Sequence, residues 1–170
     1  MPEIFKYFWF ICAAVMTINL VIWRRRLATV VERGIATQDE VDSFLRGAAA
    51  WVIGSALALG VISLVAGWTS PFCAGILAFD TLPRTLTSAV IVGAWCVLLW
   101  WVWRGRGADF LARVGPAMGN RPSYDRTYSP STVRAFVTLA IVANAVGASI
   151  AAQNVPMSAV PGCTLPTAAR

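Results

Sequence analysis

The sequence predicts an all-α integral membrane protein, built as a bundle of four transmembrane helices. Of its 170 residues, 58% are hydrophobic and only 13% are charged, and the mean hydropathy is +0.66. Soluble proteins carry about 25% charged residues, so this composition excludes a soluble globular enzyme. Apolar runs of roughly 20 residues, the length of a helix that crosses a bilayer, occur four times along the chain. Helices are expected because lipid cannot bond the open backbone of a strand.

The four predicted spans form a single membrane domain that covers residues 1–170. They contain no charged residue apart from Lys6, near the start of the first span. An arginine cluster, Arg24 to Arg26, follows the first span instead of preceding it, so we expect a retained anchor rather than a cleaved signal peptide. The spans are expected at residues 4–23, 47–66, 85–103 and 135–152.

The arginines predict the side of the membrane on which each connection lies. Segment 24–46 contains five arginines and segment 104–134 contains six, whereas the remaining connection and the two ends hold three basic residues. Because cytoplasmic connections carry the excess of basic residues, these two segments are expected in the cytoplasm. Both termini, the external loop 67–84 and the external tail 153–170 are then expected outside, in the periplasm. The residues expected to anchor the cytoplasmic side are Arg24, Arg25, Arg26, Arg104 and Arg106.

The first basic connection, residues 24–46, predicts a helical hairpin that extends the first two spans beyond the membrane. Gly34 is a natural helix stop, because glycine adopts a left-handed backbone at little cost. Thr37 and Glu40 match a capping box, in which the threonine begins the second helix and the glutamate bonds back to it.

The second basic connection, residues 104–134, predicts a short interfacial helix at 108–114. We expect its apolar side chains, Phe110 and Val114 among them, to face lipid. The pair Ser129–Pro130 supplies an N-cap followed by proline at the first helical position, so the fourth helix is expected to start there.

The four cysteines divide into two in spans and two outside them. Cys12 and Cys96 lie within apolar runs, where thiols behave as small hydrophobic side chains. Cys73 and Cys163 are both expected outside, in an oxidising compartment where disulfides persist. We therefore predict a Cys73–Cys163 disulfide that ties the external tail to the external loop.

Small residues and one amide predict a helix interface. Asn144 lies near the middle of the fourth span, and an amide in hydrocarbon seeks a partner across a helix contact. Gly54, Gly60 and Gly147 belong to patterns of small residues at four-residue spacing, which let helices approach closely. With four spans available, packing within the chain is favoured over packing against another subunit.

The sequence contains little chemical machinery. Histidine is absent, and no CxxC pair, nucleophile elbow, Walker loop or metal-ligand cluster occurs. The spans contain no carboxylate, which argues against a proton-coupled exporter. The basic loop matches no nucleic-acid-binding motif. We therefore expect no catalytic residue, no metal, no cofactor and no nucleic-acid partner.

Spans without chemical machinery favour a non-enzymatic interaction protein in a bacterial cytoplasmic (inner) membrane. We expect an accessory subunit of a membrane complex, or an immunity or exclusion protein. Its partners would be the lipid bilayer and either another membrane protein or further copies of this chain. One alternative is an oligomeric channel or small-solute transporter, and another is a membrane thiol-redox or lipid-modifying enzyme. A polar path through a channel would need Ser55, Thr87, Ser88 and Asn144.

Overall fold

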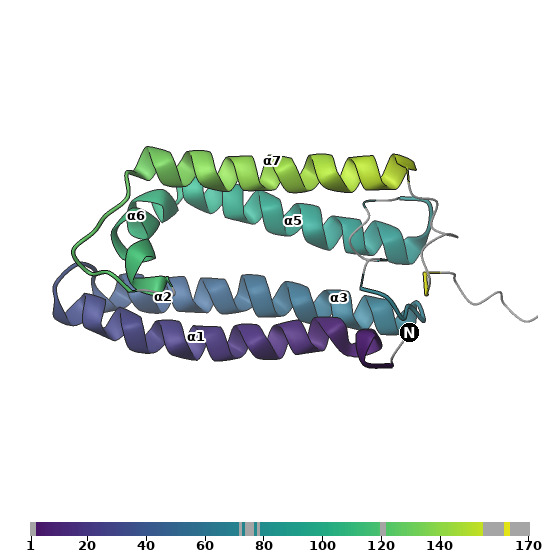
Figure 1. Cartoon of the computed structure of the whole chain (residues 1–170), viewed down its shortest axis with the longest axis horizontal. Helices are drawn as coiled ribbons and strands as arrows, with labels where there is room; N and C mark the ends of the chain where they lie inside the picture. The colour runs from purple at the N-terminus through teal and green to yellow at the C-terminus, as the bar shows by residue number, and fades with distance from the viewer. Residues whose placement is uncertain are drawn as a thin grey trace, which may run out of the picture.

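The computed structural model describes residues 3–71, 73, 77, 79–119, 122–154 and 162–163. Within these residues the chain is helical and contains no strand (Figure 1). The helices in chain order are η1 (Glu3–Tyr7), α1 (Phe8–Glu32), α2 (Gln38–Ala48), η2 (Ala49–Ile53), α3 (Gly54–Val65), α5 (Leu82–Arg104), α6 (Gly107–Met118) and α7 (Pro130–Asn154).

Four continuous helical segments are long and apolar enough to cross a membrane, with mean hydropathies from 1.8 to 2.2. This confirms an all-helical chain with four helices of transmembrane length and composition. Each of the four predicted spans lies within one of these segments, apart from residue 4 at the start of the first span and residue 66 at the end of the second. The segments are Phe5–Glu32, Gln38–Val65, Leu82–Arg104 and Pro130–Asn154.

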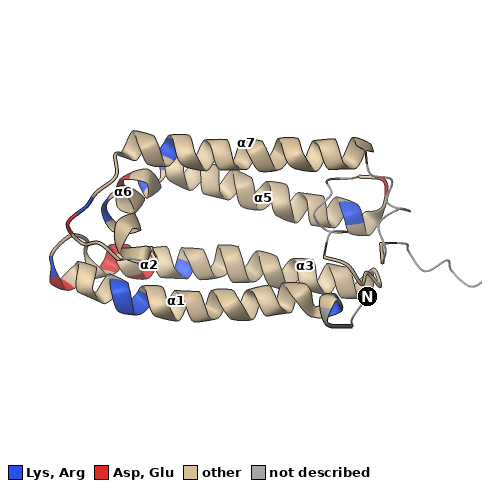
Figure 2. Ribbon diagram, in the orientation of Figure 1, with Lys and Arg blue, Asp and Glu red and all other residues tan. Residues whose placement is uncertain are grey.

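The long helices pack mainly on their neighbours in the chain. α1 lies against α3, α3 against α5, and α5 against α7 (Figure 1). The short α6 closes one end, where it contacts α1, α5 and α7. We call this the hairpin end, because the turn from α1 to α2 lies there, and the opposite end, with Cys73 and Cys163, the disulfide end. Figure 2 shows that most charged residues lie toward the two ends of the helices.

The turn between α1 and α2 follows local signals in the sequence. Gly34 has a positive φ of 70°, which glycine adopts without the cost that a Cβ would add. The backbone N–H of Glu40 donates to Thr37 Oγ1 at 3.3 Å, and the N–H of Thr37 donates to Glu40 Oε2 at 2.9 Å. The predicted capping box and the predicted hairpin are both confirmed.

The predicted orientation of α6 is wrong. Phe110 is only 6% exposed and Val114 is fully buried, and both pack on the hairpin rather than facing lipid. The physical reason is that Leu27, Val30 and Val41 extend past the apolar spans and need cover from water.

Pro116 lies inside α6, although we had expected the helix to end before it. Proline has no N–H, so the carbonyl of Ala112 loses its helical donor. The N–H of Tyr128 donates to that carbonyl instead, at 2.8 Å. The loop after α6 thus supplies the hydrogen bond that the helix lacks. The next helix, α7, begins at Pro130 as predicted. Ser129 caps it, because its Oγ accepts from the Thr132 N–H at 3.1 Å.

Candidate functional site

Among the four candidate spans, α7 is packed least against the rest of the chain. Its most apolar stretch contains no buried residue, compared with 6% in the segment that contains α1, 22% in the α2–α3 segment and 17% in α5. Five large hydrophobic side chains along α7 are between 51% and 72% exposed. They are Phe136, Leu139, Val142, Val146 and Ile150. Nearly the whole length of this apolar helix is therefore open to lipid or to another apolar partner.

One flank of α7 carries the residues that the sequence predicted for a helix interface. Asn144 is exposed, and its Nδ2 donates to the carbonyl of Ala140 in the same helix at 2.8 Å. Gly147 is also exposed, and a Cβ added to it would meet nothing within 4 Å. The favoured expectation that these two residues pack within the chain is wrong, because α7 turns a different side, with Ile141 and Ala145, away from the surface.

The two glycines of the second span have different surroundings. Gly60 is buried, and a Cβ there would lie 2.9 Å from the ring of Phe10, so this glycine allows α1 and α3 to approach closely. Gly54 is exposed and has open space around it. Gly60 is thus an interface glycine within the chain, as predicted, and Gly54 is not.

The second span contains a π-helical turn that the sequence did not predict. It covers Ala49–Ile53, and the indole N–H of Trp51 within it donates to the carbonyl of Ala94 in α5 at 2.9 Å. π-Turns inside helices occur frequently at functional sites. No glycine or proline lies in this stretch, so the residue pattern carries no local signal for it.

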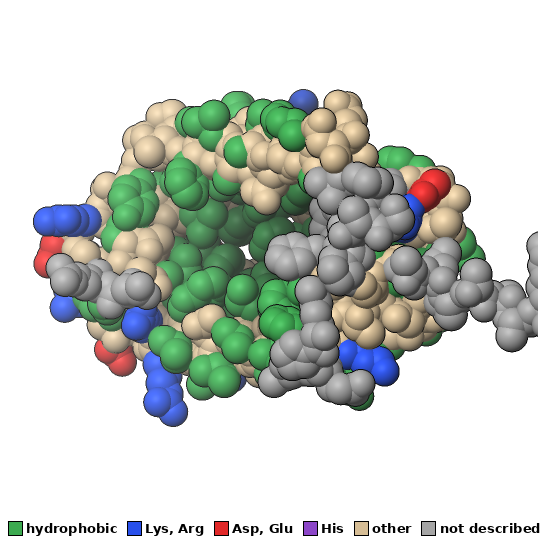
Figure 3. Space-filling view, turned by 45° about the vertical axis from the view of Figure 1, so that its right-hand side comes forward, with side chains coloured by type: hydrophobic (Ala, Val, Ile, Leu, Met, Phe, Trp, Pro, Cys, Tyr) green, Lys and Arg blue, Asp and Glu red, His purple; other side chains and the backbone are tan. Residues whose placement is uncertain are grey.

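The face shown in Figure 3 is hollowed between α7 at the top and the lower pair of helices, α1 and α3. Hydrophobic side chains line this hollow. The open side agrees with the low burial of α7. The bundle is therefore not closed around a continuous core along its whole length.

At the hairpin end, two arginines connect α6 to α1 and to the α1–α2 turn. Arg113 donates to the carbonyl of Ile35 at 2.8 Å and to Glu40 Oε1 at 2.7 Å. Arg26 donates to the carbonyls of Met118, at 3.1 Å, and Gly119. The bonds from Arg26 satisfy carbonyls at the end of α6 that have no helical partner.

The contact between Arg113 and Glu40 also changes the pKa of the Glu40 carboxyl, a group that precedes the apolar run 47–66. The hydrogen bond from Arg113 lowers the pKa of the Glu40 carboxyl from its ordinary value, and the bond from the Thr37 backbone lowers it further. The carboxylate form therefore stabilises the junction of α2 and α6.

The predicted basic anchors have different roles at the hairpin end. Arg24, Arg25, Arg104 and Arg106 are exposed, whereas Arg26 is half-buried beneath α6. Arg106 connects α5 to α6 with a positive φ of 61°, which is uncommon for a residue other than glycine. Only Arg26, among the five, is shown to hold another element in place.

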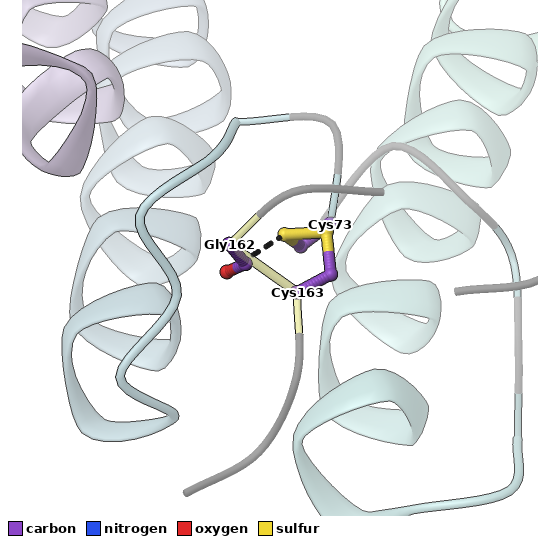
Figure 4. Close-up of a disulfide and its surroundings, with 3 residues drawn as sticks. All are labelled: Cys73, Gly162 and Cys163. Carbon is purple, nitrogen blue, oxygen red and sulfur yellow. Dashed lines mark hydrogen bonds between the residues drawn. A yellow bond between two sulfur atoms is a disulfide. The ribbon is translucent and has the colours of Figure 1, made fainter. Parts of the chain in front are cut away.

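At the disulfide end, Cys73 and Cys163 are bonded, with an S–S distance of 1.99 Å (Figure 4). The bond joins the segment after α3 to the segment after α7, as the sequence predicted. Both cysteines are fully buried and pack with Trp68, which is 1% exposed. Gly162 has a φ of 86°, and a Cβ there would lie 2.1 Å from Thr69 Oγ1, so no larger residue fits. Of the predicted external tail, residues 155–161 and 164–170 lie outside the described part of the chain.

Three of the four residues named for a polar path form hydrogen bonds within their own helices. Ser55 donates to the carbonyl of Trp51 at 2.6 Å, and Thr87 donates to the carbonyl of Arg84 at 2.9 Å. Asn144 does the same in α7. Thr87 and the neighbouring Ser88 are fully buried, whereas Asn144 is exposed on another helix. Such local bonds satisfy polar side chains in an apolar helix.

The exposed flank of α7 is the strongest candidate for a functional surface. This flank is exposed, and it contains Asn144 and Gly147, two residue types that favour contacts between helices in membranes. Comparisons with protein-family models, curated proteins and solved structures found no match to this chain.

Proposed function

We propose that this chain is a non-enzymatic integral membrane interaction protein, in which another membrane protein packs on α7. It would act as an accessory subunit of a membrane complex, or as an immunity or exclusion protein. The observation that carries this proposal is an apolar helix of 25 residues with none of them buried, whose exposed flank holds Asn144 and Gly147.

Exposure alone does not distinguish a partner from lipid, because lipid tails are as apolar as aliphatic side chains. The composition of the exposed flank favours a partner, since helices in membranes associate through small residues and interhelical amide bonds. Ala140, Asn144 and Gly147 follow one another at helical spacing and are all exposed. The Asn144 amide, bonded only to its own helix, retains donor and acceptor capacity for a second helix.

The two ends of the bundle support an orientation with both termini outside a bacterial cytoplasmic membrane. The predicted basic anchors lie in the last part of α1 and at the junction of α5 and α6, which are at the hairpin end, and this favours the cytoplasm for that end. The disulfide lies at the opposite end, and disulfides persist in the oxidising periplasm. Two independent chemical arguments thus favour the same orientation.

Purification from the native membrane in mild detergent tests the proposal. We expect a stoichiometric companion with the wild-type chain, and its loss with Gly147→Leu or Asn144→Leu. Gly93→Leu is the matched control, because Gly93 is also exposed and a Cβ there meets nothing within 4 Å. A wild-type chain that is monomeric and without companions would overturn the proposal, and so would a homo-oligomer that conducts ions in liposomes, which would support the channel alternative.

A further inference from the structure

A groove of about 430 Å³ lies between α5 and α7, near the start of α7. Its polar end is formed by Ser131 and Arg134 together with Trp103 of α5. Its other end is lined by Ala135, Leu139 and Val142. From Arg134 to Val142 the helix rises by about 12 Å, so the groove changes from cationic to apolar along the direction in which α7 would cross a bilayer.

Arg134 places a positive charge at the polar end of this groove, which we call the mouth. Its guanidinium lies over the ring of Trp103, 5.8 Å from the centroid. The Nε–H of Arg134 is buried and has no hydrogen-bond partner. Among the described residues, no carboxylate lies within 4.0 Å of this guanidinium. A guanidinium with no carboxylate partner at one end of an apolar groove is suited to an anion.

The surrounding side chains fix the geometry of the mouth. The Trp103 indole N–H donates to Thr138 Oγ1 at 3.2 Å, which holds the ring between α5 and α7. Tryptophan prefers the headgroup level of a membrane, and Arg134 immediately precedes the predicted span 135–152. Ser131 also lines the groove, and its hydroxyl lies 2.8 Å from that of Ser129.

We propose that this groove binds one anionic phospholipid of the adjacent leaflet. The phosphate would accept from the Arg134 guanidinium and the Ser131 hydroxyl, and one acyl chain would lie along Ala135, Leu139 and Val142. Charge-assisted bonds to phosphate suit the planar guanidinium, and the apolar end suits a hydrocarbon chain. The proposal goes beyond the helix contact at Asn144 and Gly147, because it uses the other flank of α7, and each proposal can fail without the other.

Native mass spectrometry of the full chain with added phosphatidylglycerol tests this site. We expect one lipid to be retained preferentially over phosphatidylcholine. In Arg134→Gln the affinity for phosphatidylglycerol should fall about tenfold, since a hydrogen bond to a charged group is lost. Arg134→Lys should restore part of it. Arg104→Gln, which removes an exposed arginine next to Trp103, is the control and should keep the lipid.

A second variant tests the same site in case Arg134→Gln fails to fold. Val142→Trp fills the apolar end of the groove and leaves Arg134 in place, and it should weaken binding as well. Equal retention of phosphatidylglycerol by Arg134→Gln and the wild type would overturn the proposal. Displacement of the lipid by inorganic phosphate, which lacks an acyl chain, would also overturn it. A third contrary result would be a variant whose oligomeric state changes while its number of bound lipids equals that of the wild type, which would assign the groove to a second copy of the chain.

Discussion

Single residues decide how closely the helices of this protein approach one another. Gly60 has no Cβ, which allows α1 and α3 to approach closely. The ring of Phe10 in α1 occupies the space that a Cβ at this position would need. Gly54, six residues earlier in the same span, has open space around it. Each glycine belongs to its own row of small residues at four-residue spacing, and the two rows face different surroundings.

This difference predicts opposite results for the same substitution. Gly60→Leu should lower the free energy of unfolding by about 1–3 kcal/mol, since it forces α1 and α3 apart. Gly54→Leu should cost nothing, because its side chain enters open space and leucine favours helix over glycine. Thermal unfolding of both variants in the same detergent measures the difference. Equal losses at the two positions would contradict the close packing at Gly60.

Glu40 makes the stability of the hairpin end depend on pH. Its pKa is lowered in the folded chain, chiefly by the hydrogen bond from Arg113. Its contribution is therefore present above the ordinary glutamate pKa and is lost as the pH falls through the lowered value. Because both side chains are more than a third exposed, the contribution is about 0.2–1 kcal/mol.

Glu40→Gln tests this contribution without removing the helix cap, since glutamine also completes a capping box. The variant should unfold at a lower temperature than the wild type at neutral pH, and the difference should vanish in acid. Asp39→Asn, at an exposed acid of the same helical turn, is the control. A difference between Glu40→Gln and wild type that persists unchanged in acid would refute the role of the carboxylate.

Among the helices, α6 has a position that the sequence did not predict. Its apolar side chains suit a lipid surface and a protein core equally well, and the local pattern does not distinguish them. The hairpin decides the outcome, because α1 and α2 extend beyond the apolar runs and present a second apolar surface to α6. The capping box and the start at Pro130 were predictable because their chemistry is complete within four residues. The π-turn at Ala49–Ile53 depends on Trp51 reaching α5, a contact distant in sequence.

The burial of α6 predicts a large effect at Phe110. Phe110→Ala should lower the free energy of unfolding by about 3–5 kcal/mol, as for a core aromatic, and should make residues 104–129 more susceptible to proteolysis. Leu139→Ala, at a position 68% exposed on α7, should change stability little. Limited proteolysis and thermal unfolding of both variants provide the measurement. A small loss of stability in Phe110→Ala would contradict the burial of α6 and would favour the expectation that α6 faces lipid.

At the scale of the whole molecule, the disulfide connects two segments separated by 90 residues in the sequence. Cross-linking a long loop mainly restricts the unfolded chain, so Cys73→Ser should cost about 2–5 kcal/mol. The helical content and any companion protein should be retained. Circular dichroism, thermal unfolding and co-purification test this. Loss of a biological activity with stability unchanged would instead favour the thiol-redox alternative.

The orientation is a property of the whole molecule that labelling measures directly. In a Cys12→Ala, Cys96→Ala background, a cysteine at Phe79, which is exposed at the disulfide end, should react with a membrane-impermeant maleimide in intact bacteria. A cysteine at Ser43, exposed at the hairpin end, should react only after lysis. The reverse pattern would place the basic connections outside and contradict the proposed orientation.

The central claim is that α7 packs on another protein in the membrane. Photo-crosslinking in the native membrane tests it most directly, with a photoreactive residue at Ala140, on the flank with Asn144, and a control at Val97, which is 57% exposed on α5. We expect a discrete protein adduct from position 140 and none from position 97. Lipid adducts alone at both positions would show that α7 faces only the bilayer, and would contradict the claim.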